Sequence, residues 1–377
     1  MNAINASLRN SSLENMTNAQ IACPVTGDGT VSKAMLTTAY CIILILSLVG
    51  NTLIILIVYR NPRMWTASNF LIVNMAASDL LVPFFAVPRM IVEVLVGRER
   101  WLIDGTAGLI LCKLAYFFQD VSNAVSVQSL IAITADRFYA VMFPLKANAM
   151  KSYIRFVIPA IWLTAFGLHA PYLQVFKLCV VGDKLYCCQR WPKTTSLHSK
   201  FIYFYLILLL VFGVPLITII ILYVFIVYKL FRRKFPLGAG NSMTQTQRNR
   251  RAKQNKNILK LSVTIVVIFF LCFSPLLVLA ILRTTGSISQ CNIEVFRIVA
   301  KLFAQSNCAV NSFVYYVFNT QFRRGFISYL KAIVCCLDES NNGTNTTVGY
   351  STTGQKISLL SQKRTKQNLS ITETISE

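Results

Sequence analysis

The sequence has few charged residues and very few acidic ones. Asp, Glu, Lys and Arg make up 14% of the 377 residues, and only 14 residues are Asp or Glu. Soluble domains carry about 25% charged residues, so the composition argues against a water-soluble enzyme. The chain has two histidines, His169 and His198, which are too few for a metal centre or a catalytic triad. We expect no enzyme activity and no cofactor apart from an ion discussed below.

Apolar residues dominate what remains. Hydrophobic residues make up 55% of the chain and aromatic residues 12%, with a mean hydropathy of +0.55. This excludes a disordered chain. The formal net charge of +23 would suit nucleic acid only if it lay on a folded soluble face. Here the basic residues lie between apolar runs, so no nucleic-acid partner is expected.

Seven runs are long enough to cross a hydrocarbon core of about 30 Å as helices. They cover approximately residues 34–59, 68–95, 107–141, 154–176, 201–231, 257–283 and 292–318. The last run contains polar residues that are tolerable only if they face a bundle interior. The predicted fold class is an all-α membrane protein with a seven-transmembrane helix bundle, spanning residues 34–318.

The basic residues predict the orientation. The stretch from Lys229 to Lys260 contains ten Lys and Arg residues and no acidic residue, so it is expected to be cytoplasmic. An odd number of spans then places the amino terminus outside a plasma membrane and the carboxyl terminus inside. Residues 1–30 have no signal-peptide core, so the first span is expected to act as the anchor. Segment 1–33 is predicted to be glycosylated at its sequons, Asn5, Asn10 and Asn15.

After the last span, residues 319–336 alternate apolar and basic residues. We predict an amphipathic helix (helix 8 of the fold) on the inner membrane lipids, palmitoylated at Cys335 and Cys336. Two ordinary free thiols are the alternative. Residues 337–377 are polar, rich in Ser and Thr, and predicted to be disordered.

One carboxylate lies in the middle of an apolar span. Asp79 has no basic residue nearby in its own helix, and burying a charge there is costly. Polar groups on other spans are predicted to converge on it, namely Asn51, Ser126, Asn307 and Asn311. Oxygen ligands suit a sodium ion or a water cluster. The alternative is a protonated Asp79 that ties helices together.

The third span carries polar groups at both ends. Gln119 and Arg137 are 18 residues apart in the sequence, which is about 27 Å along a helix and crosses the core. Gln119 and Asp120 are therefore placed near the outer mouth, and Asp136 and Arg137 at the inner face. Six cysteines face the oxidising side, Cys23, Cys112, Cys179, Cys187, Cys188 and Cys291, and their pairing is left open.

These features together resemble the rhodopsin-like (class A) G protein-coupled receptors, over residues 34 to about 336. The matching positions, in order, are Gly50, Asn51, Ser78, Asp79, Leu80, Cys112, Asp136, Arg137, Phe138, Trp162, Pro215, Tyr223, Phe269, Cys272, Pro275, Asn311 and Tyr315. Three departures are Phe138 in place of Tyr, Phe273 in place of Trp, and Ser312 in place of Pro. Softer or differently biased activation is expected from them.

The resemblance implies a bundle with two packings. The Asp136 and Arg137 pair would favour the closed one, and an outward motion of the sixth span would expose a cleft for a heterotrimeric G protein. The residues implied in this switch and in coupling are Asp136, Arg137, Pro215, Tyr223, Phe269, Pro275 and Tyr315. Tyr223 and Tyr315 are expected to close a water-bridged contact near Arg137. Arrestin and receptor kinases are implied as partners of the tail.

The resemblance also bears on the ligand. Gln119 stands where amine receptors have their anchoring Asp, and Gln305 stands where opsins have their retinal Lys, so neither ligand is expected. The sequence Cys187 to Pro192 is similar to the second loop of neuropeptide receptors of the neuropeptide FF, neuropeptide Y, orexin and tachykinin type. That alignment pairs Cys187 with Cys112 and leaves Cys188 to bridge Cys179 or Cys23.

We therefore expect an extracellular neuropeptide as ligand. The candidate ligand-binding residues are Glu93, Tyr116, Gln119, Asp120, Phe273, Arg283, Lys301 and Gln305, with Phe117 on the apolar floor. Acidic members would receive basic side chains of the peptide, while Arg283, Arg297 and Lys301 would receive acidic ones. Salt bridges among these residues themselves are the alternative. A lipid or other non-peptide ligand is the second hypothesis, and a seven-helix transporter, which would need inverted repeats, is the third.

Overall fold

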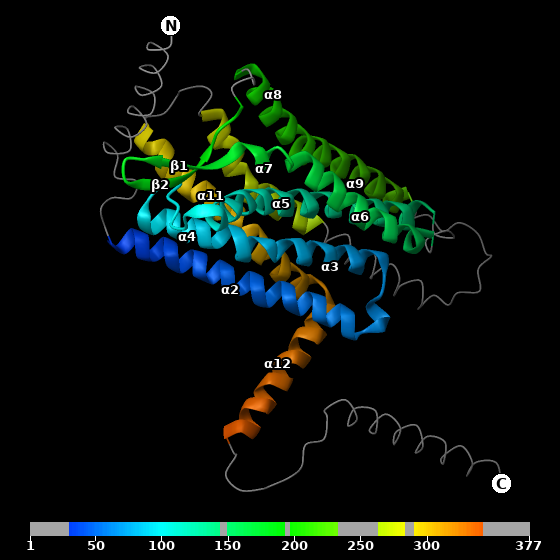
Figure 1. The fold of residues 1–377 in the computed structure, drawn as a ribbon. Coiled ribbons are helices and arrows are strands. Elements are labelled where there is room, and N and C mark those ends of the chain that lie inside the picture. Colours follow the sequence, from blue (N-terminus) through cyan, green and yellow to red (C-terminus); the bar gives the residue numbers. More distant parts are fainter. Residues whose placement is uncertain (1–29, 144–148, 193–196, 233–262, 283–289, 342–377) are drawn as a thin grey trace, which may run out of the picture. The chain divides into compact units, whose positions relative to one another are not determined.

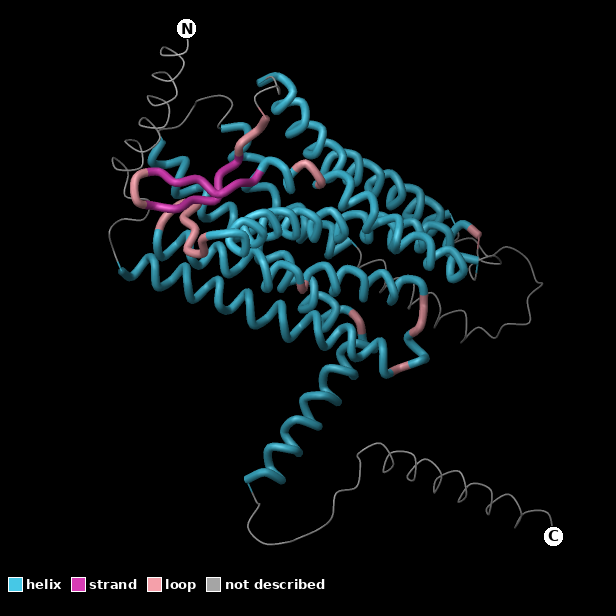
Figure 2. The backbone as a smooth tube through the Cα atoms, viewed as in Figure 1, coloured by secondary structure: helices cyan, strands magenta, loops and turns pink. Residues whose placement is uncertain are grey.

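The computed structural model describes residues 30–143, 149–192, 197–232, 263–282 and 290–341. The chain divides into two compact units, Met1–Phe326 and Ile327–Glu377. The first unit contains long helices that run side by side, together with one β-hairpin (Figures 1 and 2). All structural statements below concern the described residues.

Helical segments occur in all seven predicted spans, within the residues that the structure describes. They are α2 (Thr30–Arg60); α3 (Ala67–Asp79) continued by η2 (Val82–Ala86) and α4 (Val87–Val96); α5 (Gly105–Met142); α6 (Ala149–His169) with the short α7 (Tyr172–Val175); α8 (Leu197–Leu208) continued by η4 (Leu209–Gly213) and α9 (Val214–Arg232); an unlabelled helix, Val263–Leu282; and α11 (Gln290–Phe318). A short turn, η1 (Pro62–Met64), joins α2 to α3.

Five of these segments are long and apolar enough to cross a membrane. They are Thr30–Arg60, Ala67–Val96, Ser152–Val175, Ile202–Lys229 and Val263–Leu282. The other two predicted spans form helices α5 and α11 but carry more polar residues. In α5 these polar residues include Ser122, Ser126 and Ser129, which are buried in the protein and do not face lipid. The lower hydropathy of α5 therefore follows from its position among other helices.

Proline explains why two of the spans are not regular α-helices. The π-helical segments η2 and η4 end at Ala86 and Gly213, and each is followed two residues later by a proline, Pro88 and Pro215. Proline has no N–H, so the carbonyl group four residues earlier loses its helical donor. The helix widens there, and the N–H of Val214 bonds the carbonyl of Leu209, five residues back.

Helix α5 packs against α3, α6 and α9 and lies in the middle of the bundle (Figure 1). Helices α2 and α11 also pack together, and they approach closely at Gly50. A Cβ atom at Gly50 would lie 2.7 Å from the Cβ of Ser312 and closer still to its hydroxyl group. Glycine at this position therefore allows the two helices to pack.

The hairpin consists of β1 (Phe176–Val181) and β2 (Lys184–Gln189), which pair antiparallel with Leu178 opposite Cys187 (Figure 2). Gly182 has φ 59° in the turn, a conformation that favours glycine. Residues Glu99 to Trp101 extend the pairing, since the Cys187 N–H donates to the Glu99 carbonyl at 3.0 Å. A disulfide joins Cys187 to Cys112 of α5, with 5.8 Å between their Cα atoms. The implied bridge is confirmed.

Helix α12 begins at Thr320 and ends at Asn341. The predicted amphipathic segment ended at 336, so the helix is longer than expected. No Gly or Pro interrupts the chain between Lys331 and Asn341, which allows the helical hydrogen bonds to continue. Within the first unit, a Cβ at Gly325 of this helix would lie 2.7 Å from a methyl carbon of Ile57, so α12 starts in close contact with α2.

Candidate functional site

Polar and charged side chains gather at three levels along α5. We call the end of the bundle that carries β1 and β2 the hairpin end, and the opposite end of α5 the Arg137 end. The three levels are a group of ion pairs at the hairpin end, a buried carboxylate in the middle and a second charged group at the Arg137 end. Each is described in turn.

The group at the hairpin end joins two helices through one carboxylate. The Glu93 carboxylate of α4 accepts hydrogen bonds from the Lys301 ammonium of α11, with both oxygens at 3.0 Å, and from the Arg297 guanidinium of α11. Arg89 Nη1, one turn before Glu93, lies 3.7 Å from Glu93 Oε2. We call Arg89, Glu93, Arg297 and Lys301 the ionic cluster. In this structure the acidic and basic candidates therefore pair with one another.

Arg89 connects the ionic cluster to α5. Its Nη2 donates to Gln119 Oε1 at 2.6 Å, and its guanidinium carbon lies 4.0 Å from the centre of the Tyr116 ring. The Tyr116 ring in turn stacks on Phe176 of β1, with 4.0 Å between ring centres. Sequence reasoning missed Arg89. The available signal was an ionisable residue inside an apolar run, four residues before Glu93.

Other ligand candidates lie elsewhere. The Asp120 side chain hydrogen-bonds Tyr172 of α7, away from the Gln119 side of the helix. Phe117 packs on Phe166 of α6, with 5.8 Å between ring centres, and not on the floor of a pocket with Tyr116. Gln305 is buried one turn beyond Lys301 on α11. Arg283 lies outside the described residues.

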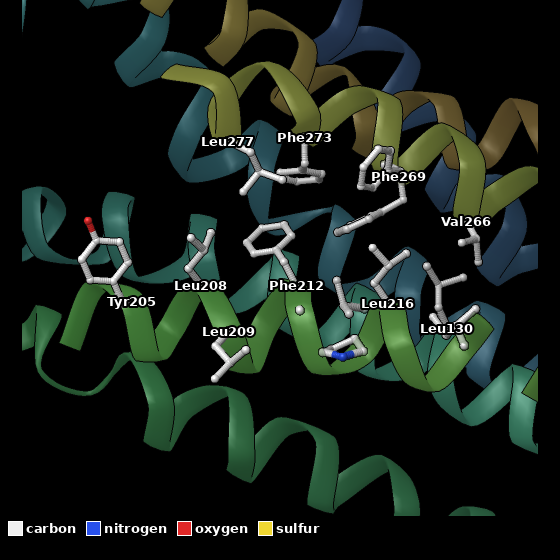
Figure 3. Close-up of a pocket in the computed structure, with 15 residues that line it drawn as sticks. Leu130, Tyr205, Leu208, Leu209, Phe212, Leu216, Val266, Phe269, Phe273 and Leu277 are labelled. Carbon is white, nitrogen blue, oxygen red and sulfur yellow. The ribbon is translucent and has the colours of Figure 1, made fainter. Parts of the chain in front are cut away.

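An apolar cavity of about 290 Å³ lies between α5, the α8–η4–α9 segment and the helix Val263–Leu282 (Figure 3). Phe269 and Phe273 face Phe212 across it, and the ring centres of Phe273 and Phe212 are 5.2 Å apart. Pro215 also lines it. Three residues that the resemblance implies in switching or binding, Phe269, Phe273 and Pro215, thus meet in one place. Pro275 lies on the same helix as Phe269 and Phe273.

The buried carboxylate in the middle is Asp79, with 2% of its surface exposed. Its Oδ1 accepts from the Ser126 hydroxyl of α5 and its Oδ2 from the Asn311 amide of α11, both at 2.9 Å. Ser126 also lies 3.3 Å from the hydroxyl of Ser78. Asp79 therefore connects α3, α5 and α11, as the sequence interpretation expected for Ser126 and Asn311.

The two remaining members of the predicted set, Asn51 and Asn307, make no hydrogen bond to Asp79 among the described residues. Asn51 donates to the carbonyl groups of Ser47 and Cys308, each at 3.0 Å, so it joins α2 to α11 and not to Asp79 directly. Asn307 is 3% exposed, and its Oδ1 accepts no hydrogen bond from any described residue. Ser47, which the sequence reasoning did not include, links the two groups because its hydroxyl approaches the Asp79 carbonyl at 3.4 Å.

The residues around Asp79 suit a small hard cation. The side chains joined here are the Asp79 carboxylate, the Ser126 hydroxyl and the Asn311 amide. Asn307, on the same helix as Asn311, has a buried oxygen without a donor among the described residues. Among the same residues no cluster of three His, Cys, Asp or Glu side chains occurs, so a zinc-type site is not indicated.

A further buried hydrogen-bond chain ties α6 to α3 and α5. Trp162 Nε1 donates to Asn74 Oδ1 at 2.8 Å, and the Asn74 amide donates to the Ser129 hydroxyl at 2.9 Å. All three side chains find partners that a lipid environment cannot supply. Trp162 therefore helps to hold α6 against α3 through Asn74.

At the Arg137 end, charge holds α5 to α3. Arg137 Nη2 donates to Asp136 Oδ2 at 2.7 Å and also to the hydroxyl of Ser68, at the start of α3. The Ser68 hydroxyl donates to the same Asp136 oxygen at 2.5 Å. The charge pair expected from the sequence is therefore formed, and Ser68, which sequence reasoning missed, makes it an interhelical link.

Tyr223 and Tyr315 were expected to meet near Arg137. In the structure Tyr315 contacts other residues. The Tyr315 hydroxyl lies 3.6 Å from the sulfur of Met75 on α3, and its ring packs 5.8 Å from that of Phe322. In this packing the ring fills space between α11, α3 and α12. Tyr223 lies on α9, half-buried.

Two hairpin cysteines remain thiols beside the disulfide. The Cys179 and Cys188 thiols lie beside each other and donate to the carbonyl groups of Lys177 and Tyr186. Burial, together with the contact with Cys179, raises the pKa of Cys188 to about 12. Of the two predicted partners for Cys188, Cys179 therefore lies next to it, while Cys23 lies outside the described residues. So do Asn5, Asn10 and Asn15, and the side chains of Cys335 and Cys336 are not described.

Comparison with known proteins agrees with this arrangement. The model of the 7 transmembrane receptor (rhodopsin family) matches residues 50–315. The RYamide receptor of Drosophila melanogaster is 29% identical over 84% of this chain and 68% of its own length. The QRFP-like peptide receptor of Branchiostoma floridae is 28% identical over 80% and 79%, and neuropeptide FF receptor 1 of Homo sapiens is 29% identical over 80% and 71%.

The chain belongs to the rhodopsin family of seven-transmembrane receptors. The predicted seven-helix membrane fold and the resemblance to class A receptors are confirmed. The prediction that the chain is a receptor and not an enzyme is confirmed by the same match. The relatives include neuropeptide FF receptors, one of the groups named from the second loop.

Proposed function

We propose that this protein is a plasma-membrane receptor for an extracellular neuropeptide and passes the signal to a heterotrimeric G protein. The hairpin end is the outer, peptide-binding end in this proposal, and the Arg137 end is cytoplasmic. The names of its relatives, receptors for RYamide, QRFP-like and neuropeptide FF peptides, support a peptide ligand. The ten basic residues between Lys229 and Lys260 support the orientation.

The observation that carries the proposal is the link between Ser68, Asp136 and Arg137. It fixes the end of α5 to α3, and it can be broken without unfolding either helix. In this proposal the bundle has two packings, closed while the link is intact and open when Arg137 is released. Peptide binding at the other end changes their ratio only as far as the peptide prefers one packing.

The peptide must supply enough binding free energy to change the ratio of the two packings. Moving a two-state equilibrium from 1:99 to 99:1 needs about 5.5 kcal/mol of differential binding. A peptide that contacts α4, α5 and α11 together can supply this if those helices move relative to one another. Pro215 and Pro275 each remove a backbone hydrogen bond from one of the two segments that border the apolar cavity. These segments can therefore bend at little cost in free energy.

A sodium ion at Asp79 is part of the proposal. Asp79, Ser126 and Asn307 would hold it by their side-chain oxygens, and Asn311 and Asn51 would orient the surrounding groups. When bound, the ion would neutralise the negative charge of the buried carboxylate. The chain's own contribution is to keep α3, α5 and α11 joined at this level.

Further proposals concern segments beyond the described side chains. Glycosylation at Asn5, Asn10 and Asn15 follows from an outer amino terminus. Palmitoylation at Cys335 and Cys336 would hold α12 on the inner membrane lipids. Arrestin and receptor kinases would bind the tail, whose 14 Ser and Thr residues after Asp338 offer phosphorylation sites.

A lipid or other non-peptide ligand is the second candidate function. The apolar cavity lined by Phe212, Phe269 and Phe273 favours it, since its walls would accept an acyl chain. The peptide hypothesis is preferred because the hairpin end offers charged and hydrogen-bonding groups and because the relatives named above are peptide receptors.

The test uses the full chain in mammalian cell membranes, with nucleotide exchange on added heterotrimeric G proteins as readout. Amidated peptide libraries are expected to stimulate exchange, and Gln119→Ala is expected to reduce potency without loss of surface expression. Arg137→Ala should abolish stimulated exchange while peptide binding persists. Full stimulated exchange in Arg137→Ala, or antibody access to the amino terminus only after permeabilisation, would contradict the proposal. Stimulation by lysophospholipids and by no peptide would support the second candidate.

A further inference from the structure

The ionic cluster contains more positive than negative groups. Arg89, Arg297 and Lys301 all lie within ion-pair distance of the single carboxylate of Glu93. Exposed ion pairs are screened by water, but here the side chains of Arg89, Arg297 and Glu93 are 6%, 3% and 8% exposed. Charges in such surroundings interact strongly and need partners.

Arg89 shows that the cluster lacks acceptors. Its Nε and Nη1 groups are buried and donate no hydrogen bond to any residue that the structure describes. A buried guanidinium N–H without an acceptor is costly, more so than a neutral donor. The neighbouring groups add no negative charge, because Gln119 contributes a neutral amide oxygen and Tyr116 a ring face and a neutral hydroxyl. An additional anion would therefore be stabilised at this position.

The cluster can be reached from one side. The Lys301 side chain is 26% exposed, whereas those of the three other members are below a tenth. Lys301 is thus the member that an incoming group meets first. The Tyr116 ring covers another side of the Arg89 guanidinium and itself stacks on Phe176, so access is from the Lys301 side.

We propose that the ionic cluster binds a carboxylate of the peptide agonist, which accepts hydrogen bonds from Lys301 and Arg89. This inference rests on the proposed function and names the chemistry that its binding site selects. It reverses one expectation from the sequence, that Glu93 receives a basic group of the peptide. A basic side chain would add a fourth cation beside a carboxylate that already serves three.

The carboxylate has two possible sources, an Asp or Glu side chain or a free carboxyl terminus. Four synthetic hexapeptide libraries distinguish them: amidated or free-acid termini, each with or without Asp and Glu in the mixture. Nucleotide exchange is measured in membranes containing the full chain. Activity in the amidated library with Asp and Glu identifies a side chain, and activity in the free-acid library without them identifies the terminus. Equal activity in the amidated library that lacks both acids would overturn the inference alone, whereas no activity in any library would overturn the proposed function with it.

Variants then test the contact itself with the most active peptide. Lys301→Gln should raise the half-maximal concentration about tenfold, the scale of one lost charged hydrogen bond. It should have no such effect on the same peptide with its carboxylate replaced by an amide. Lys113→Gln, a lysine near the same end of α5 but outside the cluster, is the matched control. Equal loss of potency for acid and amide peptides in Lys301→Gln would overturn the inference even if the libraries had favoured acids.

Discussion

The Ser68 hydroxyl donates a hydrogen bond of 2.5 Å to the Asp136 carboxylate and accepts one from Arg137, so one small side chain on α3 completes the charge pair on α5. A pair of adjacent residues on one helix cannot by itself hold two helices together. Ser68 turns a local ion pair into a link between two helices. The closed packing therefore depends on Ser68 as well as on the charges.

Ser68→Ala tests this dependence. Removing the hydroxyl eliminates the interhelical hydrogen bonds but leaves both charges, so the open packing should become more populated. We expect ligand-independent nucleotide exchange to rise about two- to tenfold, the effect of losing about one hydrogen bond to a charged group. Thr218→Ala is the control, since the Thr218 hydroxyl bonds only the carbonyl of Val214 in its own helix. Basal exchange equal to that of the unaltered receptor would contradict the role given to Ser68.

A second prediction concerns the hydrogen bond from Trp162 to Asn74. Trp162→Phe keeps an aromatic ring but leaves the Asn74 oxygen without its donor. We expect a loss of about 1–3 kcal/mol in stability. Thermal unfolding of detergent-solubilised protein measures it. Leu163→Ala, next in sequence and 70% exposed, should change the melting temperature much less. Equal melting temperatures for Trp162→Phe and the unaltered protein would show that the bond contributes nothing.

The contact at Gly50 makes a third prediction. Gly50→Ala would bring a Cβ within 2.7 Å of that of Ser312, so α2 and α11 must move apart. Overpacking of this kind costs about 1–3 kcal/mol. Reduced melting temperature and reduced surface expression are the readouts. Gly167→Ala is matched, because a Cβ there meets no atom within 4 Å. Normal expression and stability of Gly50→Ala would mean that the two helices have room to adjust.

Asp79 provides a fourth prediction. If sodium binds at Asp79 in the closed packing, then sodium chloride should lower agonist potency relative to choline chloride of the same ionic strength. In Asp79→Asn the two salts should act alike. Ser306 lies on the same helix α11, and its hydroxyl donates to the carbonyl of Phe303. Ser306→Ala should therefore retain the difference in agonist potency between the two salts. Identical potency in the two salts for the unaltered receptor would remove the sodium proposal.

The hairpin thiols give a prediction that depends on pH. Because burial and the contact with Cys179 raise the pKa of Cys188 to about 12, the thiol is protonated from neutral pH up to pH 9. The thiolate is the reactive form, so alkylation by iodoacetamide at pH 8 should be slow and should accelerate tenfold per pH unit. Peptide mass spectrometry of Cys188 measures the rate. Rapid modification at pH 7, or a Cys179–Cys188 disulfide in the isolated receptor, would contradict the thiol pair described here.

Much of the fold follows from simple patterns in the sequence. Apolar runs predicted seven spans, and helices occur at all seven, because in a membrane each helix must satisfy its own backbone. The resemblance to neuropeptide receptors implied the Cys112–Cys187 bridge, which spacing alone left open. The contact of Ser126 and Asn311 with Asp79 was also expected, since a buried carboxylate requires polar neighbours and few exist at that depth.

What the sequence did not indicate depends on the direction of side chains. Arg89 and Ser68 are obvious only when α3, α4 and α5 are placed together, because neither residue belongs to a motif. The mutual pairing of Glu93 and Lys301 was only an alternative, since residues 208 positions apart give no local signal of contact. Asp120 and Tyr315 contact other residues than expected, because packing against Tyr172 and Met75 is decided by neighbouring helices.

The π-helical segments before Pro88 and Pro215 have a consequence for how these two spans present their surfaces. A π turn holds one more residue than an α turn, so it acts as a one-residue insertion in the helical repeat. Side chains beyond it are rotated by about 100° relative to an unbroken helix. Loss of the extra residue from η4 would turn Tyr205 and Leu208 out of phase with Pro215, so a single deletion there should disturb the receptor more than a substitution at any one of these positions.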